Sequence, residues 1–287
     1  MPELAGRVKN GHFTIFDQPC NVKEIFEPIR SLYHFDTPCE ELHPYIEFFA
    51  ESTPEQYKVW TGGTNFRIEM YPSWTPTMYI NFGPSYRMTI GSKTYTIAAG
   101  EDVLLLRDGY VCRHNPPDDY IFTVKFFPGG LEAVLGLSQL PLIGKVIKLH
   151  EILPTSLIKK IKEAADFQER KMIFERFFIE TKSRRTGDHY LDFITDTIGT
   201  HFNGALQFNV EQVAERRFVS SKTLNRYFHR VVGLPPKKYF SLVRARTALT
   251  AFIADRAHFN PERFSYHDKS HFYRDIMSFT GHRIKDN

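Results

Sequence analysis

Cysteine is scarce in this chain, and long apolar runs are absent from it. The 287 residues include three cysteines, Cys20, Cys39 and Cys112, which form neither a C-x-x-C pair nor an even-numbered set. This usage differs from that of a disulfide-stapled secreted protein and favours a reducing compartment. The sequence has no apolar run of about 18 residues, and its first residues lack the apolar core of a signal peptide. We therefore expect a cytoplasmic protein with no membrane-spanning segment.

Motifs for metal binding and nucleophilic catalysis are scarce as well. His114 has no H-x-H partner, whereas a metal-binding barrel needs two neighbouring histidines and usually a carboxylate. His267 and His271 lack Cys or Glu partners at ligand spacing, which favours a capping or DNA-facing role. Cys112 precedes Arg113, a pattern compatible with an activated thiolate, but a partly buried cysteine at a strand end is the better interpretation. We expect no metal, no cofactor and no catalytic residue, and hence no enzyme.

Charge is spread unevenly along the chain. The formal net charge is +4. Residues 188–287 carry 15 Lys and Arg against 10 Asp and Glu, whereas residues 1–187 carry 22 against 23. The positive excess therefore lies in the C-terminal third, as expected of a segment that contacts phosphates.

The middle of the N-terminal half has the pattern of a β-rich domain. Short runs of alternating or continuous apolar residues lie between turn residues; they span 58–60, 67–70, 78–82, 86–90, 95–97, 103–106 and 120–126. Many short strands at regular spacing, with no helical stretch between them, predict an antiparallel barrel or sandwich.

Helical periodicity replaces this pattern after residue 130. It predicts helices at 131–137, 154–165 and 167–182, and the apolar face of the last helix fits either a dimer contact or packing on the barrel. The polar residues 183–188 contain a glycine and indicate a short domain boundary. From residue 190 onward the periodicity is helical throughout.

Residues 210–233 have the pattern of a helix-turn-helix. A short helix is predicted at 210–216, and Ser220 can cap the next one by accepting from a free backbone N–H. Leu224 and Phe228 then recur at helical spacing, and Gly233 ends the helix where a positive φ is needed. Two short helices with a tight connection and a basic outer face describe this element.

The last helices repeat part of this pattern. Asp268 is followed by apolar residues and an arginine at the same spacing as Ser220 in the first element, which makes a second recognition helix plausible.

These spaced motifs resemble the DNA-binding domain of AraC/XylS-type transcription regulators, over residues 205–282. The matching residues are Val213, Ala214, Ser220, Leu224, Arg226, Phe228, Gly233, Pro236, Tyr239, Arg244, Ala248, Tyr266, Asp268, Ser270, His271, Phe272, Arg274, Asp275, Phe279, Thr280 and Gly281. The chain departs from the family at Asn260-Pro261, where Ile-Ala is usual, and at Ser265, where the turn has Gly. Pro261 is tolerable in the first turn of a helix, and Ser265 must either accept a strained turn or change the geometry of that turn.

The resemblance implies two helix-turn-helix units joined by a long helix, with recognition helices in successive major grooves about one turn apart. The residues expected to contact DNA are Ser221, Lys222, Thr223, Asn225, Arg226, Lys237, Lys238, Lys269, Ser270, His271 and Arg274. Arg and Lys suit guanine, and Asn suits adenine. Ser221, Thr223 and the Lys237-Lys238 pair suit phosphates.

The β-rich region is similar in layout to the sensor domains of that family. We therefore expect an α+β protein of two domains. Residues 1–183 form a cupin-like antiparallel barrel or sandwich for sensing or dimerisation, with helices packed at about 131–182. Residues 188–287 form an all-α double helix-turn-helix. A ligand pocket is expected from Tyr71, Trp74, Tyr79, Phe82, Tyr86 and Arg87.

The expected function is a sequence-specific transcription regulator that responds to an effector through its N-terminal domain. Its partners would be double-stranded DNA, a small-molecule effector, a second copy of the chain and, for an activator, RNA polymerase. The alternative is a small-molecule-binding or enzymatic β-barrel whose helical tail is a degenerate interaction module.

Overall fold

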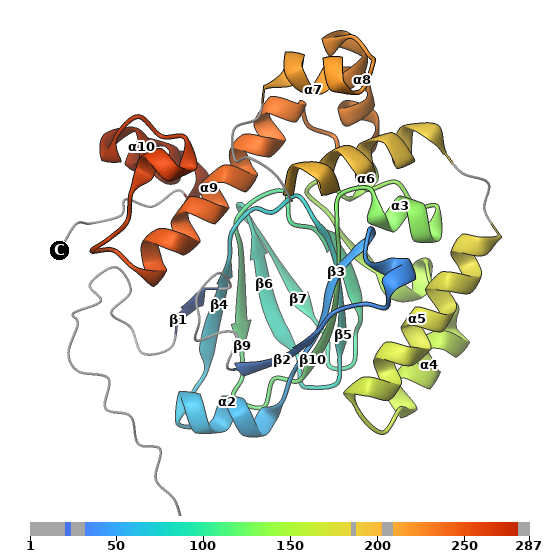
Figure 1. The fold of residues 1–287 in the computed structure, drawn as a ribbon. Coiled ribbons are helices and arrows are strands. Elements are labelled where there is room, and N and C mark those ends of the chain that lie inside the picture. The colour runs from blue at the N-terminus through green and yellow to red at the C-terminus, as the bar shows by residue number, and fades with distance from the viewer. Residues whose placement is uncertain (1–20, 24–31, 185–187, 203–208, 281–287) are drawn as a thin grey trace, which may run out of the picture.

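Two antiparallel sheets form the N-terminal half of the molecule in the computed structural model, which describes residues 21–23, 32–184, 188–202 and 209–280 (Figure 1). The five-stranded sheet has the order β1-β4-β9-β6-β7, and the six-stranded sheet has the order β11-β8-β5-β10-β3-β2. The parallel pairing of β1 with β4 is the exception to the antiparallel pattern of both sheets. The strands are β1 (Asn21–Lys23), β2 (Tyr33–Asp36), β3 (Ile46–Ser52), β4 (Phe66–Met70), β5 (Pro76–Asn81), β6 (Tyr86–Ile90), β7 (Lys93–Ile97), β8 (Val103–Leu106), β9 (Val111–Asn115), β10 (Ile121–Phe126) and β11 (Val146–Lys148).

The central strands β5, β8 and β10 of the six-stranded sheet are buried on both faces. In strand β10, successive side chains alternate between the two faces of the sheet. Phe122 and Val124 belong to the core beneath the helices, whereas Ile121 belongs to the core between the sheets. Thr123 and Lys125 share the inward face with Ile121 and line the barrel interior. The β-rich barrel or sandwich predicted from the sequence is therefore confirmed.

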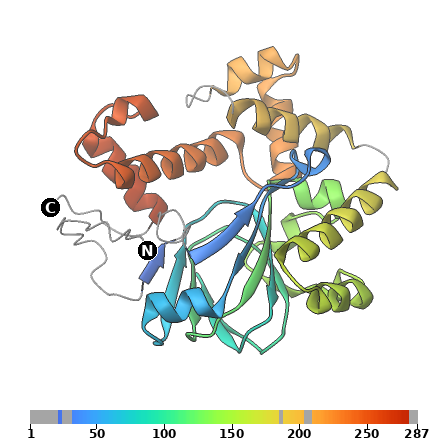
Figure 2. The same cartoon turned by 60° about the horizontal axis from the view of Figure 1, so that its bottom comes forward.

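Helices α3 (Gly130–Leu135), α4 (Thr155–Glu163) and α5 (Phe167–Ser183) cover the outer face of the six-stranded sheet (Figures 1 and 2). Asp166 caps α5 by accepting from the Glu169 amide. Phe174 and Phe178 are fully buried against the sheet, whereas Met172 is 59% exposed. Packing on the barrel therefore accounts for the main apolar stripe of α5.

The prediction of a strand at 58–60 is wrong, because these residues lie in helix α2 (Pro54–Thr61). Pro54 occupies the first helical turn, where its missing N–H costs nothing, and Gly62 ends the helix with a φ of 61°. Tyr57 and Thr61 are buried four residues apart. Helix capping and tertiary packing thus outweigh the β propensity of Val59 and Trp60.

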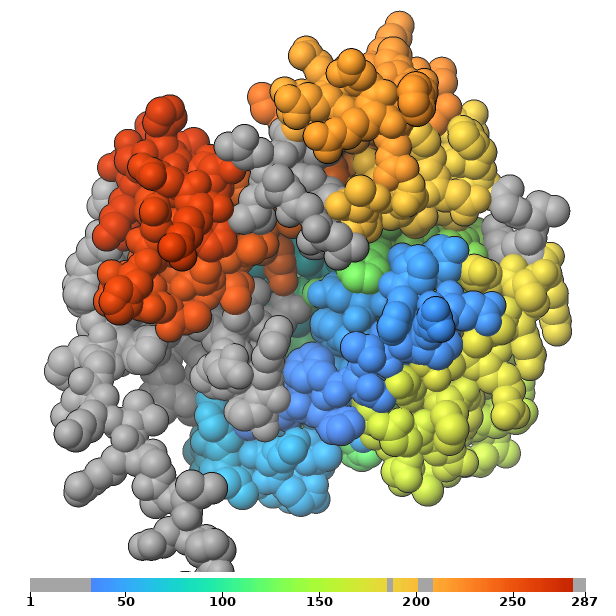
Figure 3. Space-filling view, viewed as in Figure 1, coloured from blue at the N-terminus to red at the C-terminus, as the bar shows by residue number. Residues whose placement is uncertain are grey.

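The C-terminal residues are helical, as predicted. The helices are α6 (His189–Phe202), α7 (Val210–Arg216), α8 (Ser221–Val231), α9 (Pro236–Ala254), the 3-10 helix η4 (Pro261–Phe264) and α10 (Lys269–Thr280). Helix α9 joins two helical units, which form separate lobes on the surface: α7 with α8 at the top and α10 at the left (Figures 1 and 3). The α+β arrangement of a β-rich half followed by a helical half is confirmed, whereas residues 185–187 of the expected boundary lie outside the described residues.

Candidate nucleic-acid interface and barrel cavity

The first helical unit has both of its helix starts capped by side chains. Asn209 Oδ1 accepts from the amides of Glu211 and Gln212, and Ser220 Oγ accepts from the Thr223 amide at 3.1 Å. Each bond satisfies a backbone donor that the helix itself leaves free. The predicted cap at Ser220 is therefore confirmed, and it fixes the direction in which α8 begins.

The outer face of α8 is polar and accessible. Leu224 and Phe228 are fully buried, whereas Lys222 and Arg226 are exposed four residues apart. The other residues predicted to contact DNA from this unit lie nearby in sequence: Ser221, Thr223 and Asn225 are half-buried, and Lys237 and Lys238 are exposed in the first turn of α9. The Asn225 side chain donates to the Ser221 carbonyl at 2.8 Å, so a base contact has to compete with this bond.

The turn between α7 and α8 holds a residue that sequence reasoning missed. Phe218 has a φ of 55° and is 95% exposed. Left-handed backbone is unfavourable for a phenylalanine, and the turn of a helix-turn-helix often contains glycine. In the sequence, Phe218 could have been identified as a turn residue because it stands two residues before the Ser220 cap.

The second unit forms despite its departures from the family pattern. Its first element is the four-residue η4 with Pro261 in the first turn, and Ser265 takes a φ of 60°, as the strained turn requires. Asp268 Oδ1 accepts from the His271 amide at 2.7 Å, which caps α10. Phe272 is fully buried, as is Ile276, while the predicted DNA contacts Lys269, Ser270 and Arg274 are exposed and His271 is half-buried.

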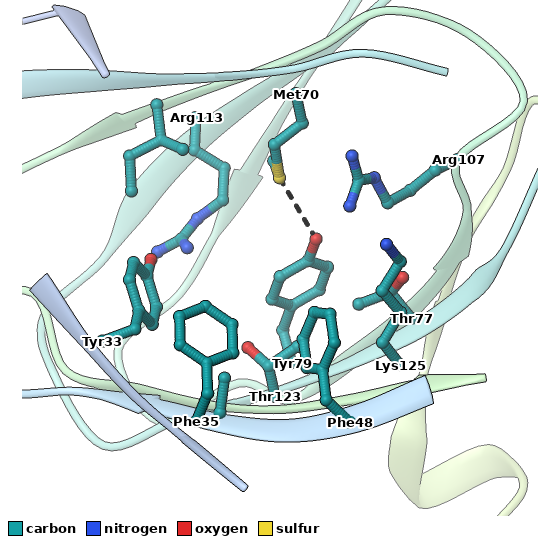
Figure 4. Close-up of a pocket in the computed structure, with 12 residues that line it drawn as sticks. Tyr33, Phe35, Phe48, Met70, Thr77, Tyr79, Arg107, Arg113, Thr123 and Lys125 are labelled. Atoms are coloured by element: carbon teal, nitrogen blue, oxygen red, sulfur yellow. Dashed lines mark hydrogen bonds between the residues drawn. The ribbon is translucent and has the colours of Figure 1, made fainter. Parts of the chain in front are cut away.

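A cavity of about 50 Å³ lies inside the barrel between the two sheets (Figure 4). Its apolar walls come mainly from aromatic side chains, and three buried cations also face it. The lining residues are Tyr33, Phe35, Phe48, Ala50, Ile68, Met70, Thr77, Tyr79, Arg107, Arg113, Thr123 and Lys125.

Arg113 is the most firmly paired of these cations. Its Nη2 donates to both carboxylate oxygens of Asp119 at 2.9 and 3.0 Å, and its guanidinium lies 4.7 Å from the Tyr86 ring centre. Burial opposes the charged form, but Asp119 and the neighbouring tyrosines hold the pKa of Arg113 well above its ordinary value. Burial also raises the pKa of Asp119, against the lowering effect of Arg113. Arg113 lies at one end of the cavity (Figure 4).

The other two cations lie at the opposite end of the cavity (Figure 4). Lys125 Nζ is 3.0 Å from Glu47 Oε2 and 5.2 Å from the centre of the Phe48 ring. Arg107 donates from Nη2 to the Tyr71 carbonyl at 3.0 Å. With Arg113 included, three buried cations line the cavity.

Sequence reasoning found one residue of this cavity, Tyr79. The other five predicted pocket residues lie elsewhere: Tyr71 and Trp74 against the C-terminal helices, Phe82 beside Tyr120 and Arg170, Tyr86 over Arg113, and Arg87 exposed opposite His114 on the five-stranded sheet. The sequence feature that could have revealed the cavity is Lys125, the charged residue of β10, which lies at an inward position.

Cys112 is buried, with 6% of its surface exposed. Burial raises the pKa of its thiol, and Glu69 adds to this effect. Arg113 points into the barrel and is bonded to Asp119, so it does not activate the thiol. Cys112 therefore lies near the start of a strand, as interpreted, but it is buried rather than partly buried.

The described residues contain neither a metal-ligand cluster nor a membrane-spanning helix. Within them, no group of three or more His, Cys, Asp or Glu side chains is arranged to hold a metal ion. No helix in the same ranges is both long enough and apolar enough to cross a bilayer.

No protein-family model and no curated protein sequence matches this chain. Among solved structures, ToxT from Vibrio cholerae O395 is similar over 77% of this chain and 94% of its own, with 10% identity and a TM-score of 0.44. Wild-type ToxT with a bound unsaturated fatty acid, from Vibrio cholerae strain SCE256, is similar over 76% of this chain and 92% of its own, with 12% identity and a TM-score of 0.41. The cupin domain of an XRE-family transcriptional regulator from Enterobacter cloacae covers 33% of this chain and 92% of its own, with 12% identity and a TM-score of 0.25.

Proposed function

We propose that this protein is a cytoplasmic, sequence-specific transcription regulator of the AraC/XylS type, and that an effector controls it through the β-rich domain. The supporting observation is the pair of capped helices, α8 and α10, each with an exposed basic face, joined by the single helix α9. A two-unit arrangement of this kind suits two successive major grooves on one face of DNA, roughly 34 Å apart.

Base contacts are assigned to Lys222, Asn225 and Arg226 in the first unit. Arg and Lys donate to guanine O6 and N7, and Asn pairs with adenine. Phosphate contacts, which set the register, fall to Ser221, Thr223, Lys237 and Lys238. The second unit contributes Lys269, Ser270, His271 and Arg274.

The effector site is the barrel cavity, and its chemistry favours a small apolar molecule with one anionic group. Apolar walls suit the body of such a molecule, and Arg107 and Lys125 suit its anion. A fatty acid, as bound in the ToxT structure, has this chemistry. Ligand pockets are usually 300–1,000 Å³, so a cavity of about 50 Å³ has to widen when the effector enters.

Residues up to 183 would then serve as a sensor and dimerisation domain, and residues 188–287 as the DNA-binding domain. A second copy of the chain is a partner of the first domain, and RNA polymerase is a partner if the protein is an activator.

The test begins with selection of bound sites from a random DNA pool by the full chain. Arg226→Ala is then expected to weaken binding to the selected site by about 1–3 kcal/mol and to relax specificity at one position. Lys160→Ala, which removes an exposed cation from α4, is the matched control and should leave binding unchanged. Equal affinity and specificity of wild type and folded Arg226→Ala would refute base reading by α8.

The alternative function, a ligand-binding or enzymatic barrel with a degenerate helical module, has support in the short η4 and the strained turn at Ser265. It predicts that the full chain shows no salt-dependent binding to any DNA in the pool and turns over a small molecule.

A further inference from the structure

We infer that residues 71–75, between β4 and β5, form a clasp that ties both helix-turn-helix units to the barrel, and that Arg107 is the latch through which an anionic effector opens it. This inference rests on the proposed effector site. Its structural core is one carbonyl oxygen, that of Tyr71, which accepts from Arg107 on the cavity side and from Arg246 on the α9 side.

The clasp holds the first unit through Trp74. The indole Nε1 donates to the Val232 carbonyl at 2.5 Å, at the C-terminal end of α8. The Trp74 ring is partly buried against both the barrel core and the core of the first unit. Gly233 lets the barrel approach the end of α8 closely, because a Cβ there would lie 2.8 Å from the Leu140 side chain.

The clasp holds the second unit through Tyr71. Its ring lies 5.6 Å from the Phe279 ring of α10 and is buried in the same cluster as Ile276. Helix α9 is held as well, because Arg246 Nη1 donates to the carbonyls of Tyr71 and Pro72 at 3.2 and 3.1 Å. One five-residue segment therefore contacts both recognition helices, α8 and α10, and also α9, the helix that joins them.

Arg107 controls the shape of this segment. Its carbonyl accepts from the amides of Ser73 and Trp74 at 3.0 Å each, and its own amide donates to Thr75 at 3.2 Å. Its side chain is 2% exposed and lines the barrel cavity (Figure 4). A ligand group that binds in the cavity and displaces Arg107 therefore disturbs the hydrogen bonds that hold the clasp.

Backbone strain is located in the clasp. Trp74 has a φ of 56°, and in the described part of the chain it shares a positive φ with two other non-glycine residues, Phe218 and Ser265. Such a conformation persists when surrounding contacts hold it. Loss of the Arg107 or Val232 contact removes that support and favours a relaxed conformation of the segment.

Binding of an anionic ligand group supplies the free energy that breaks the hydrogen bond between Arg107 and the Tyr71 carbonyl. A carboxylate accepts a stronger hydrogen bond from a guanidinium than a neutral carbonyl does, so it displaces Tyr71 from Arg107. Lys125 extends the effect, because it lines the barrel cavity and also a second cavity of about 100 Å³ between the barrel and α9. The ligand binds the open state better and shifts the population towards it.

Trp74 provides its own reporter, since the chain has two tryptophans. In full-length Trp60→Phe, the fluorescence of Trp74 reports how accessible the clasp is to acrylamide. Adding Arg107→Gln is expected to raise the quenching constant about threefold or more and to shift emission to longer wavelength. Arg170→Gln, which removes a buried arginine bonded to Glu51 away from the clasp, is the matched control and should leave quenching unchanged.

Arg246→Gln is the second variant, because it loosens the clasp from the helix side at a half-buried position. It should raise quenching in the same direction even if Arg107→Gln fails to fold. Unchanged quenching in folded Arg246→Gln would overturn the clasp.

Decanoate and 1-decanol, which share an apolar chain, test the anion. Decanoate should raise Trp74 quenching in the Trp60→Phe protein and have no effect after Arg107→Gln, while decanol should have no effect. No response to decanoate, or an equal response to decanol, would overturn the role of the anion. These fluorescence measurements need no DNA, so they test the clasp separately from the proposed function. If decanoate opens the clasp but the protein binds no DNA, the proposed function is refuted and the inference stands.

Discussion

Gln139 and Val232 are joined across the contact between the barrel and the first helical unit. Gln139 is fully buried, and its Nε2 donates to the Val232 carbonyl at 2.9 Å. Its Oε1 accepts from the Gly129 amide at 2.8 Å. Because both ends of the carboxamide are bonded, this side chain sets the position of the C-terminal end of α8 against the barrel.

Replacing Gln139 by Leu should therefore destabilise the protein. The change leaves the buried Gly129 amide without its acceptor, which costs about 1–3 kcal/mol. Urea unfolding followed by circular dichroism measures this loss. Gln168→Leu, at an exposed position of α5, should change stability by less than about 0.5 kcal/mol, and an equal loss in both variants would contradict the role given to Gln139.

Gly233→Ala should cost more than Gly62→Ala, although both glycines follow a helix and have positive φ, 87° and 61°. At Gly62 no atom lies within 4 Å of an added Cβ, so backbone strain alone applies, at about 1 kcal/mol. At Gly233 the new Cβ also lies 2.8 Å from Leu140 and pushes α8 away from the barrel. Thermal unfolding of the two variants gives the comparison, and identical losses would show that the close approach at Gly233 adds nothing.

Phe218→Gly should stabilise the protein by roughly 0.5–1 kcal/mol. The left-handed backbone costs a phenylalanine about 1–2 kcal/mol, and the entropy of an unfolded glycine offsets part of the gain. Its ring is 95% exposed and contributes little burial. Chemical denaturation measures the gain, for which Ser265→Gly at φ 60° is the comparison; a loss of stability in Phe218→Gly alone would assign a structural role to the ring.

The first unit could be predicted from sequence because its determinants are local. Ser220, Leu224 and Gly233 each act within one or two helical turns, as a cap, a buried position and a helix end. The second unit was also predicted, together with its departures from the family pattern. Of the two alternatives expected at Ser265, the structure has the strained turn.

The cavity could not be predicted in the same way, because its residues meet through sheet pairing over long sequence separations. Lys125 pairs with Glu47, 78 residues away, across β10 and the start of β3. Tyr86 and Arg87 are adjacent in sequence, yet the first faces the interior and the second faces solvent. Side-chain alternation separates neighbours in a strand, so residues that are close in sequence need not line the same cavity, and of the predicted pocket residues Tyr79 is the one that lines this cavity.

His114 should make the folded state less stable as pH falls below about 6.5. Burial, together with the charges of Arg87 and Arg67, lowers the pKa of this histidine from its ordinary value. The unfolded chain therefore binds the proton more readily than the folded chain, so stability rises with pH in this range and is lost as pH falls towards the folded pKa. His114→Gln removes the titrating group at similar size. The loss of thermal stability between pH 7.5 and pH 5.5 should be smaller in His114→Gln than in wild type. His258→Gln, at an exposed site beside Asp255, is the control, and an identical pH response of wild type and His114→Gln would show that His114 is not the group that senses acid.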